Sequence, residues 1–377
     1  MTNVLIAQEE LRQDSRIATK QEPGEKESPA KRESEPVIPD HKLVRRIGKG
    51  AYGEVWLARN VTGVYRAVKV VFRSSFKSDR PYEREFSGIK KFEPISRSHP
   101  SQLPILHVGR CEAAEYFYYI MELADQAEPG SGHASVGAVE ADRSGAGPDA
   151  APQGEIKKAG GARVPGSTDQ GHEGGAGAIL QSKDEQADVD PDRYEPRTLK
   201  SELKARCGLP FQECLGAAIS LTTALERLHQ HGLIHRDIKP ANIVFVNGVP
   251  KLADIGLVTR RGEAVTFVGT EGYFPPEGPG APAADIYGLG KVIYEMATGR
   301  DRLDFPEIPT DFVDQDDHAD LLELNEIILK ACAERVRDRY VDARKLRLDL
   351  TALGNGHPLP YARQMGGGSS WDDPEMD

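Results

Sequence analysis

The 377-residue sequence predicts an α+β fold of two lobes, a small β-rich lobe followed by a larger α-helical lobe. Two observations lead to this prediction. Residues 42–72 alternate β-branched and polar side chains on either side of a tight turn, which is typical of an antiparallel meander. From residue 211 onward the apolar residues instead recur at the spacing of amphipathic helices.

The β-rich lobe is expected over residues 41–125. Its strand-like runs are "KLVRRIGKG", "EVWLARN" and "VYRAVKVVF", with "VTG" as a turn. A helix is predicted over roughly 81–93, because Phe86, Ile89 and Phe92 fall on one face at three-residue steps. The runs "LPILHVG" and "YFYYIMEL" predict two further strands.

Three polar segments are expected to lie outside the folded lobes. Residues 1–40 lack Phe, Trp and Tyr and cannot bury enough apolar surface to offset chain entropy, so they are predicted to be a disordered tail, as are residues 356–377. Residues 126–192 are predicted to be a low-complexity insert, with 13 glycines and no aromatic residue over 126–180. The insert and tails are candidate binding elements for a regulatory partner. For the insert we favour simple tolerance, because loop-closure entropy grows slowly with length.

The second lobe is expected over residues 193–355. Its helices are predicted from apolar stripes over 211–232, 284–299, 318–333 and 341–354. Gly232 is a plausible C-cap of the first of these helices.

Composition narrows the functional classes. A net charge of −11 argues against a general nucleic-acid binder, which needs clustered Lys and Arg. The four cysteines have no metal-ligand spacing and are expected to be reduced core thiols. The N-terminus lacks a basic signal-peptide region, and no apolar run approaches the ~18 residues of a membrane helix. A cytoplasmic protein without membrane partners is therefore expected.

The hairpin "IGKGAYGEVW" contains glycines at positions 48, 50 and 53. Gly48, Gly50 and Gly53 would let the backbone approach a phosphate chain without Cβ clashes. Spaced glycines are common in hairpins, so a tight turn alone is an equally good interpretation of this motif by itself.

Lys69, in "RAVKV", follows on the next strand but one and can point beneath the glycines. A lysine among apolar neighbours needs an anionic partner, because an unpaired buried ammonium is costly. ATP phosphates and a helix carboxylate are the candidates, with Glu85 favoured and Glu83 as its rival. The alternative is a Lys69 that extends to solvent at the strand edge.

The segment "HRDIKPAN" places Asp237, Lys239 and Asn242 within six positions, and Asp254 follows in "LADIG". A carboxylate that orients a hydroxyl, with an amide and a second carboxylate to hold Mg²⁺, is what phosphoryl transfer requires. Lys239 can offset the charge on the transferred group. Local backbone capping by Asp and Asn is the alternative, but it does not account for all of these polar residues in this order.

Together these motifs resemble those of the eukaryotic-like protein kinase superfamily, of the serine/threonine type also found in bacteria. The resemblance runs from about 42 to 353 outside the insert and rests on "GKGAYGEV", "AVK", "HRDIKPAN", "DIG" and "PPE". Ile255 stands where the family usually has Phe, and Pro275 where it usually has Ala. Neither departure removes a catalytic group.

The resemblance implies a bilobed protein-kinase fold and transfer of the γ-phosphate of Mg·ATP to Ser/Thr hydroxyls of protein substrates. Asp237 would be the catalytic base, Lys69 and Glu85 an activating ion pair, and Asn242 and Asp254 the Mg²⁺ ligands. Lys239 would contact the transferred phosphate. The residues implied to bind the nucleotide are Ile47, Gly48, Gly50, Gly53, Val55, Ala67, Lys69, Met121, Glu122, Ala124 and Val244.

The resemblance also implies how the catalytic segments are held and regulated. Asp285 would brace the catalytic loop, and Glu277 would pair with Arg339. Thr270 would face the acceptor hydroxyl. Two activation-segment threonines are candidate phosphorylation sites, first Thr266 and then Thr259.

Two other functional classes compete with this interpretation. One is a catalytically weak nucleotide-binding scaffold, against which the intact Lys69, Asp237, Asn242 and Asp254 argue. The other is a small-molecule kinase with the same fold, against which the "GTEGY" platform for a peptide argues.

Overall fold

The computed structural model describes residues 35–50, 52–127, 189–254, 259–260, 270–278, 280–310 and 318–363. The chain divides into the units Met1–Val37 and Ile38–Asp377, and all elements below belong to the second unit. Most of the predicted insert and of both predicted tails lies outside the described residues. The disorder of the two tails therefore remains a prediction.

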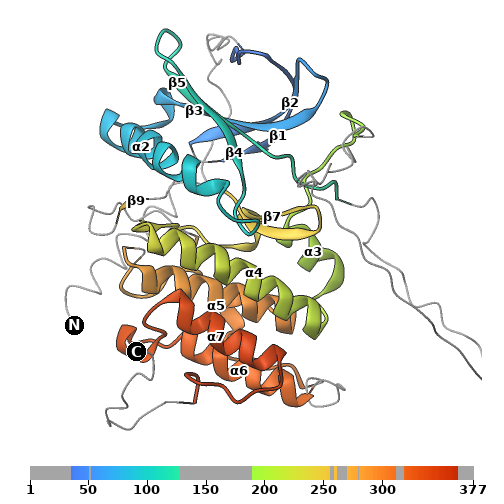
Figure 1. The fold of residues 1–377 in the computed structure, drawn as a ribbon, viewed down its shortest axis with the longest axis vertical. Coiled ribbons are helices and arrows are strands. Elements are labelled where there is room, and N and C mark those ends of the chain that lie inside the picture. Colours follow the sequence, from blue (N-terminus) through green and yellow to red (C-terminus); the bar gives the residue numbers. More distant parts are fainter. Residues whose placement is uncertain are drawn as a thin grey trace, which may run out of the picture. The chain divides into compact units, whose positions relative to one another are not determined.

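An antiparallel five-stranded sheet forms the first lobe, in the order β1-β2-β3-β5-β4 (Figure 1). Its strands are β1 (His41–Lys49), β2 (Gly53–Asn60), β3 (Tyr65–Phe72), β4 (Ile105–Cys111) and β5 (Tyr116–Met121). Along β3, Ala67 and Val71 pack in one apolar cluster and Val68 and Val70 in another. This two-residue alternation places Lys69 on the face of Ala67, the face turned toward the second lobe.

Helix α2 (Asp79–Ser96) packs against this sheet and is longer than the predicted 81–93. Ile89 and Phe92 are buried, as predicted, and Phe86 lies with its ring centroid 5.1 Å from that of Phe117 on β5. Glu85 falls on the same buried stripe, at helical spacing from Ile89. The packing of α2 therefore directs a carboxylate toward the interior.

The second lobe is mainly helical, as predicted. Its helices are α3 (Leu199–Arg206), α4 (Phe211–Gln230), α5 (Pro282–Thr298), α6 (His318–Ala331) and α7 (Ala343–Gly354). Its short strands are β6 (Leu233–Ile234), β7 (Ile243–Val246), β8 (Val249–Leu252) and β9 (Thr259–Arg260). Single 3₁₀ turns occur in the first lobe at η1 (Arg73–Ser75) and in the second lobe at η3 (Pro240–Asn242), η5 (Arg302–Asp304) and η7 (Val336–Asp338). Helix α3 was not predicted.

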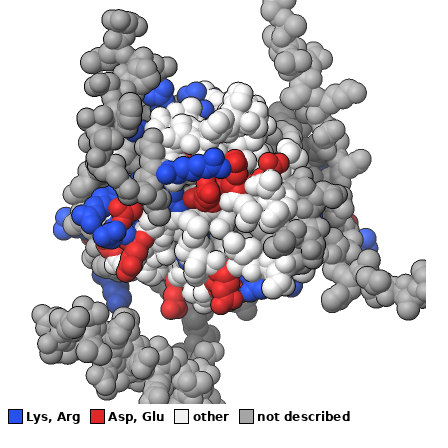
Figure 2. Space-filling model, turned by 90° about the horizontal axis from the view of Figure 1, so that it is seen from below, with Lys and Arg blue, Asp and Glu red and all other residues white. Residues whose placement is uncertain are grey.

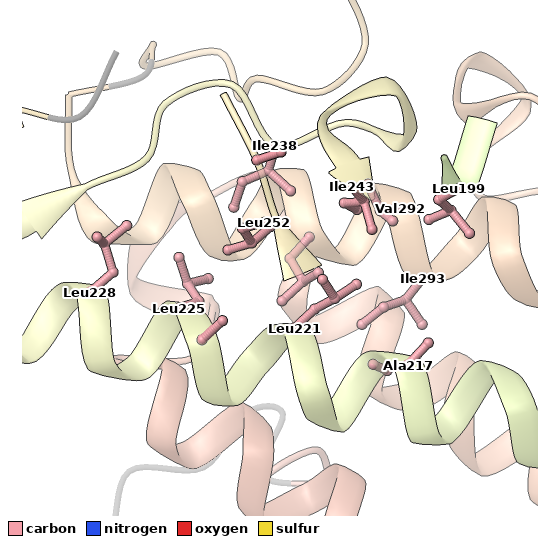
Figure 3. Close-up of a cluster of buried hydrophobic side chains, with 14 of the residues drawn as sticks. Leu199, Ala217, Leu221, Leu225, Leu228, Ile238, Ile243, Leu252, Val292 and Ile293 are labelled. Atoms are coloured by element: carbon pink, nitrogen blue, oxygen red, sulfur yellow. The ribbon is translucent and has the colours of Figure 1, made fainter. Parts of the chain in front are cut away.

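The core of the second lobe fixes the polar segment that follows β6. Figure 3 shows Leu221, Leu225 and Leu228 along α4, with Ile238 above them, and Ile293 of α5 belongs to the same buried cluster. Ile238 is only 4% exposed, although it stands between the polar residues Asp237 and Lys239. Burial of this one apolar side chain anchors the segment to the lobe, so its polar neighbours are held in place.

The packed chain extends beyond each predicted boundary. Ile38 is buried although it was assigned to the N-terminal tail, and Leu359 and Ala362 are buried although they were assigned to the C-terminal tail. Gln126, assigned to the insert, forms an antiparallel bridge with Pro196. The composition of each segment did not reveal these residues, because one or two apolar residues hardly change the average hydropathy of a long polar segment.

The cysteine and membrane predictions have different outcomes. Cys214 and Cys332 are buried free thiols, but Cys207 is exposed, so the expectation of core thiols is wrong at that position. Among the described residues, no helix is long and apolar enough to cross a membrane.

Charges of both signs are interspersed at the surface. Figure 2 shows Lys and Arg beside Asp and Glu on the face below helices α6 and α7. Arg363, for example, binds both Glu323 and Glu326. The described part of this face therefore does not present the uniform positive field that favours nucleic-acid binding.

Candidate nucleotide and phosphoryl-transfer site

A cavity of about 600 Å³ lies between the five-stranded sheet and the segment that follows β6. The structure brings the predicted nucleotide-binding residues to its walls, with one exception. Those that line it are Ile47, Gly48, Gly50, Val55, Ala67, Lys69, Met121, Glu122, Ala124 and Val244. The predicted catalytic and metal residues Asp237, Lys239, Asn242, Asp254 and Glu85 line the same cavity.

Gly53 is the exception, and its role differs from the predicted contact with phosphate. It pairs with Val71 on β3, and a Cβ at this position would lie 2.2 Å from the carbonyl oxygen of Val70. A Cβ at Gly50 would meet only the Gly53 carbonyl oxygen, at 3.8 Å. Gly53 therefore permits close approach of β2 and β3, whereas Gly50 faces the cavity.

Replacing Gly53 with Ala is expected to destabilise the fold by about 1–3 kcal/mol, because the β2 and β3 backbones must separate. Urea denaturation of Gly53→Ala and Gly50→Ala would measure this difference. Gly50→Ala should keep the wild-type free energy of unfolding within about 1 kcal/mol. Equal loss of stability in the two variants would contradict the assignment of separate roles.

Asp285 holds the backbone just before the catalytic segment, as predicted. Its Oδ2 accepts the backbone N–H of His235 and its Oδ1 that of Arg236, both at 2.8 Å. Oδ2 also faces Nε2 of His229 at 2.9 Å. Burial alone would raise the pKa of Asp285, but the contact with His229 and these hydrogen bonds lower it. Arg236 has a φ of 73°, and this anchoring offsets the cost of that left-handed backbone.

The polar residues after β6 converge on one carboxylate oxygen. Nζ of Lys239 lies 2.7 Å from Oδ2 of Asp237, and Nδ2 of Asn242 donates to the same oxygen at 2.8 Å. Nζ of Lys239 also reaches Oγ1 of Thr270 at 2.9 Å. Because Nδ2 of Asn242 faces Asp237, its amide carbonyl oxygen is the atom left to act as a metal ligand.

Lys69 does not form the predicted ion pair with Glu85. Its Nζ instead binds Oδ1 of Asp254. Burial alone would lower the pKa of Lys69, but the adjacent carboxylate of Asp254 raises it. The lysine is thus held as the charged form, with the partner that its buried position requires.

Glu85 is nevertheless the helix carboxylate that faces the cavity. Glu83 points elsewhere, with Oε2 accepting from Nη1 of Arg110 at 3.0 Å. Glu85 is 5% exposed, and its Oε2 is buried with no hydrogen-bond partner among the residues that the structure describes. Burial raises its pKa to about 8, and the nearby Lys69 only partly offsets this.

The raised pKa of Glu85 makes stability depend on pH. The ordinary pKa is 4.5, so between pH 4.5 and about 8 the unfolded chain binds fewer protons than the folded chain. The free energy of unfolding should therefore fall as the pH rises through this window. Glu85→Gln is expected to remove that fall and to raise Tm at pH 8 by about 2–4 °C or more.

Thermal unfolding of Glu85→Gln from pH 5 to pH 8 would check this expectation. Glu83→Gln, on the same helix, is the matched control. It loses only an exposed ion pair, which contributes about 1 kcal/mol or less, and should keep the wild-type pH dependence. A Glu85→Gln variant that is less stable than wild type at pH 8 would contradict the prediction.

The donor set fits a hard divalent cation. The Asn242 amide oxygen and the Asp254 carboxylate line the cavity together, and Mg²⁺ prefers such oxygen ligands. Lys69 lowers the pKa of Asp254 against the effect of burial, so that this carboxylate is ionised. These two residues would hold the metal beside the phosphate end of the cavity.

The predicted pair behind the activation segment is confirmed. Nη2 of Arg339 donates to Oε2 of Glu277 at 3.0 Å, and the Arg339 side chain is completely buried. Thr266 and Ile255 lie outside the described residues. Thr259 lies in β9, where its backbone pairs with Ile234. Both phosphorylation sites remain predictions.

Several cavity residues escaped the sequence analysis. Tyr194, Pro196 and Thr198 come from the residues just after the predicted insert, and Tyr52, Leu103 and Tyr119 come from the first lobe. Thr198 had a detectable signal, since it caps α3 with Ser201 at the third helical position. Tyr194 had none, because nothing in the local pattern joins it to the end of β5.

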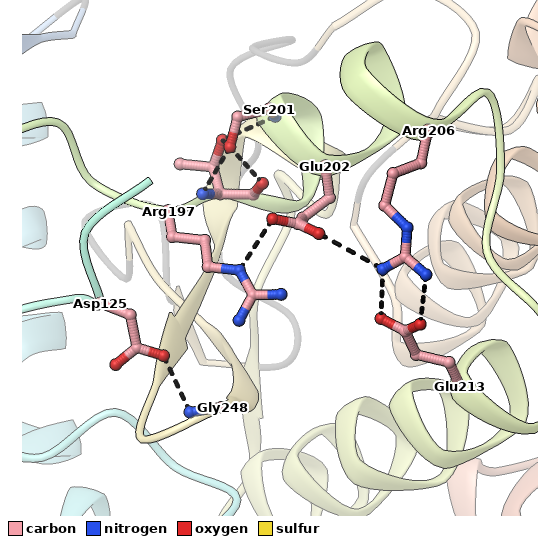
Figure 4. A network of polar contacts seen from close by, with 8 residues as sticks. Asp125, Arg197, Ser201, Glu202, Arg206, Glu213 and Gly248 are labelled. Carbon is pink, nitrogen blue, oxygen red and sulfur yellow. Dashed lines mark hydrogen bonds and ion pairs between the residues drawn. The ribbon is translucent and has the colours of Figure 1, made fainter. Parts of the chain in front are cut away.

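Figure 4 shows how α3 is tied to its surroundings. Nε of Arg197 donates to Glu202 at 2.8 Å, and Arg206 makes two bonds to Glu213. The carboxylate of Asp125 accepts the backbone N–H of Gly248 at 2.8 Å. The Arg206 bonds thus join α3 to α4, and the Asp125 bond joins the end of the β5 segment to the β7–β8 turn.

Comparison with known proteins agrees with this geometry. Residues 192–337 match the protein kinase domain family. The chain is 37% identical over 155 residues to the serine/threonine-protein kinase PknB of Mycolicibacterium smegmatis, covering 35% of this chain and 25% of that protein. It is 30% identical over 182 residues to a probable serine/threonine-protein kinase of Clostridium perfringens, covering 42% of this chain and 26% of that protein. The matched part is thus about a quarter of each relative's length.

Proposed function

We propose that this chain, of which residues 192–337 match the protein kinase domain family, transfers the γ-phosphate of Mg·ATP to Ser or Thr hydroxyls of protein substrates. One observation carries this proposal. Nζ of Lys239 and Nδ2 of Asn242 both contact Oδ2 of Asp237, at 2.7 and 2.8 Å, and Asp254 lines the same cavity. An Asx-rich surface turn would not need a buried lysine such as Lys69 opposite it.

The reaction follows from these groups. The acceptor hydroxyl oxygen attacks the γ-phosphorus, the bond from that phosphorus to the β–γ bridging oxygen breaks, and ADP leaves. Lys239 and Asn242 both bind Oδ2 of Asp237, so we assign the hydroxyl proton to Oδ1. Lys239 would also lie near the phosphoryl group during its transfer, where its positive charge stabilises the negative charge of the transition state.

ATP is expected to lie with its adenine against Met121–Ala124 and its phosphates beneath Gly48 and Gly50. Lys69 would contact the phosphates. When bound at Asn242 and Asp254, Mg²⁺ offsets phosphate charge and holds the phosphates in line. A preference for Ser and Thr over Tyr is supported by the contact between Lys239 and Thr270, which places a small hydroxyl residue beside the reacting carboxylate.

Control by phosphorylation of the activation segment is part of the proposal, with Thr266 as the first acceptor and Thr259 as the second. A phosphate there would carry about −1.5 to −2 charges and could bind a basic residue such as Arg236. Phosphosite mapping after incubation with Mg·ATP, with Thr266→Ala in parallel, would test this control separately from catalysis. Fully active protein in which neither Thr266 nor Thr259 is modified would overturn it.

The direct test is transfer of radiolabelled γ-phosphate to a generic protein acceptor, followed by phosphoamino-acid analysis. Labelled phosphoserine or phosphothreonine is expected with wild type. Asp254→Asn should give little label, because it removes a carboxylate ligand of the metal. ATP binding without transfer by wild type, at any Mg²⁺ concentration and with an activation segment phosphorylated by another kinase, would instead favour the scaffold function.

A further inference from the structure

The residues that follow the insert form part of the nucleotide cavity. We call residues 189–198 the return segment, and three of them, Tyr194, Pro196 and Thr198, line the cavity. Tyr194 lies 70 positions after Ala124 in the sequence, but its hydroxyl donates to the Ala124 carbonyl oxygen at 2.9 Å. The chain segments before and after the insert thus lie side by side at the cavity, next to Ala124.

Backbone bonds hold the return segment to the end of the β5 segment. The N–H of Ala127 donates to the backbone carbonyl oxygen of Glu195 at 2.8 Å, and the N–H of Arg197 donates to that of Asp125 at 2.7 Å. On the side of the second lobe, the N–H of Phe245 on β7 donates to the backbone carbonyl oxygen of Arg197 at 3.0 Å. The guanidinium of Arg197 also stacks on the ring of Phe245, 4.4 Å from its centroid. The return segment is therefore fixed to the second lobe.

Arg45 of β1 holds the return segment from above. Its Nε donates to the Pro191 carbonyl oxygen at 2.9 Å, and its Nη2 donates to the carbonyl oxygen of Tyr194. Alternation along β1 puts Arg45 on the face of Ile47, which lines the cavity, and Arg46 on the exposed face. Arg45 therefore joins β1 to the return segment, although Arg45 does not itself line the cavity.

Tyr194 is suited to act as a rigid wall. Its side chain is buried, with the residue only 1% exposed; its hydroxyl donates to the Ala124 carbonyl oxygen, and its own backbone carbonyl accepts from Arg45. Burial raises the pKa of its phenol, so the hydroxyl stays protonated and donates to Ala124. Tyr194 lines the cavity beside Ala124, and its hydroxyl occupies the Ala124 carbonyl oxygen.

We propose that Tyr194 is a specificity-determining residue for the nucleotide, held in place by Arg45, and that the return segment thereby sets the affinity of the cavity for the purine. This inference rests on the proposed function, because it takes ATP as the ligand. A role at the purine end predicts that adenosine and Mg·ATP lose affinity by the same factor when Tyr194 is altered. A phosphate contact would affect Mg·ATP alone.

The experiment measures Kd for adenosine and for a non-hydrolysable Mg·ATP analogue by calorimetric titration of the full chain. Tyr194→Ala should raise both Kd values by about tenfold, which corresponds to about 1.4 kcal/mol. Tyr194→Phe, which lacks only the hydroxyl, should raise both by roughly 2- to 10-fold, as expected for one hydrogen bond. Lys69→Met should raise the Kd of the Mg·ATP analogue and leave that of adenosine unchanged.

Arg45→Met tests the anchor without touching the cavity wall, and Arg46→Met is its matched control on the same strand. Arg45→Met should raise both Kd values by roughly threefold or more, for loss of bonds to two carbonyls. Arg46 makes an exposed ion pair with Glu54, so Arg46→Met should leave both Kd values within about twofold. If Tyr194→Ala does not fold, Tyr194→Phe and Arg45→Met still decide the outcome.

The failures of the two proposals are distinguishable. A wild-type chain that binds neither ligand would overturn the proposed function and this inference together. A wild-type chain that binds both, with Tyr194→Phe and Arg45→Met variants of unchanged affinity, would overturn only the role of the return segment. A loss confined to the Mg·ATP analogue would likewise overturn it.

Discussion

Replacing Asp237 with Asn is expected to lower the rate of phosphoryl transfer by about 10²–10⁴-fold, the usual contribution of a general base. The variant keeps the shape of the side chain and an oxygen that can accept from Lys239 and Asn242. It loses the charge and the basicity that the acceptor hydroxyl needs. The kcat with a protein acceptor, measured at saturating Mg·ATP, would test this expectation.

The Kd for Mg·ATP should change little in Asp237→Asn, which separates loss of chemistry from loss of binding. Asp304→Asn is the matched control, because this aspartate is exposed in η5, outside the cavity lining. The assignment of Asp237 as the base would be wrong if kcat fell less than about fivefold while Asp304→Asn behaved like wild type.

Replacing Asp285 with Ala is expected to cost at least about 3 kcal/mol of stability, because each unsatisfied buried donor costs about 1–3 kcal/mol. The donors are Nε2 of His229 and the backbone N–H groups of His235 and Arg236. Transfer activity should fall as well, since Asp237 directly follows the two residues whose backbone is released. Urea denaturation and kcat on the same preparation would measure both effects.

The pH dependence provides an independent check on Asp285. Its pKa is lower in the folded chain than the ordinary 3.8, so the stability it contributes is present above pH 3.8 and is lost as the pH falls through the folded pKa. Asp285→Ala should therefore lose less stability than wild type on acidification in this range. Asp304→Ala should keep the wild-type acid profile. Identical acid profiles for wild type and Asp285→Ala would refute the lowered pKa.

The main elements of the fold were predictable because their signals are local. The β3 alternation around Lys69 and the apolar stripe of α4 each follow from a few adjacent residues. Helix α3 was missed because it has only eight residues and little amphipathic pattern, and its position depends on ion pairs such as Arg206–Glu213. Boundaries were misplaced where one residue, such as Ile38 or Leu359, packs from within a polar stretch.

The sequence by itself determined which chemical groups this protein brings to the cavity. The order and spacing of Asp237, Lys239, Asn242 and Asp254 specified a carboxylate, an ammonium, an amide and a second carboxylate. Groups so close along the chain, or on paired strands, have few ways to be arranged. Their convergence was therefore predictable.

Only the tertiary structure decided which partner each group takes. Lys69 was expected to pair with Glu85, but the fold places Asp254 at its Nζ and leaves Oε2 of Glu85 buried without a hydrogen bond to any described residue. Tyr194 reaches the Ala124 carbonyl only because the insert returns beside the strand from which it left. Such contacts join residues distant along the chain, and their energies depend on burial and direction, which local sequence does not encode.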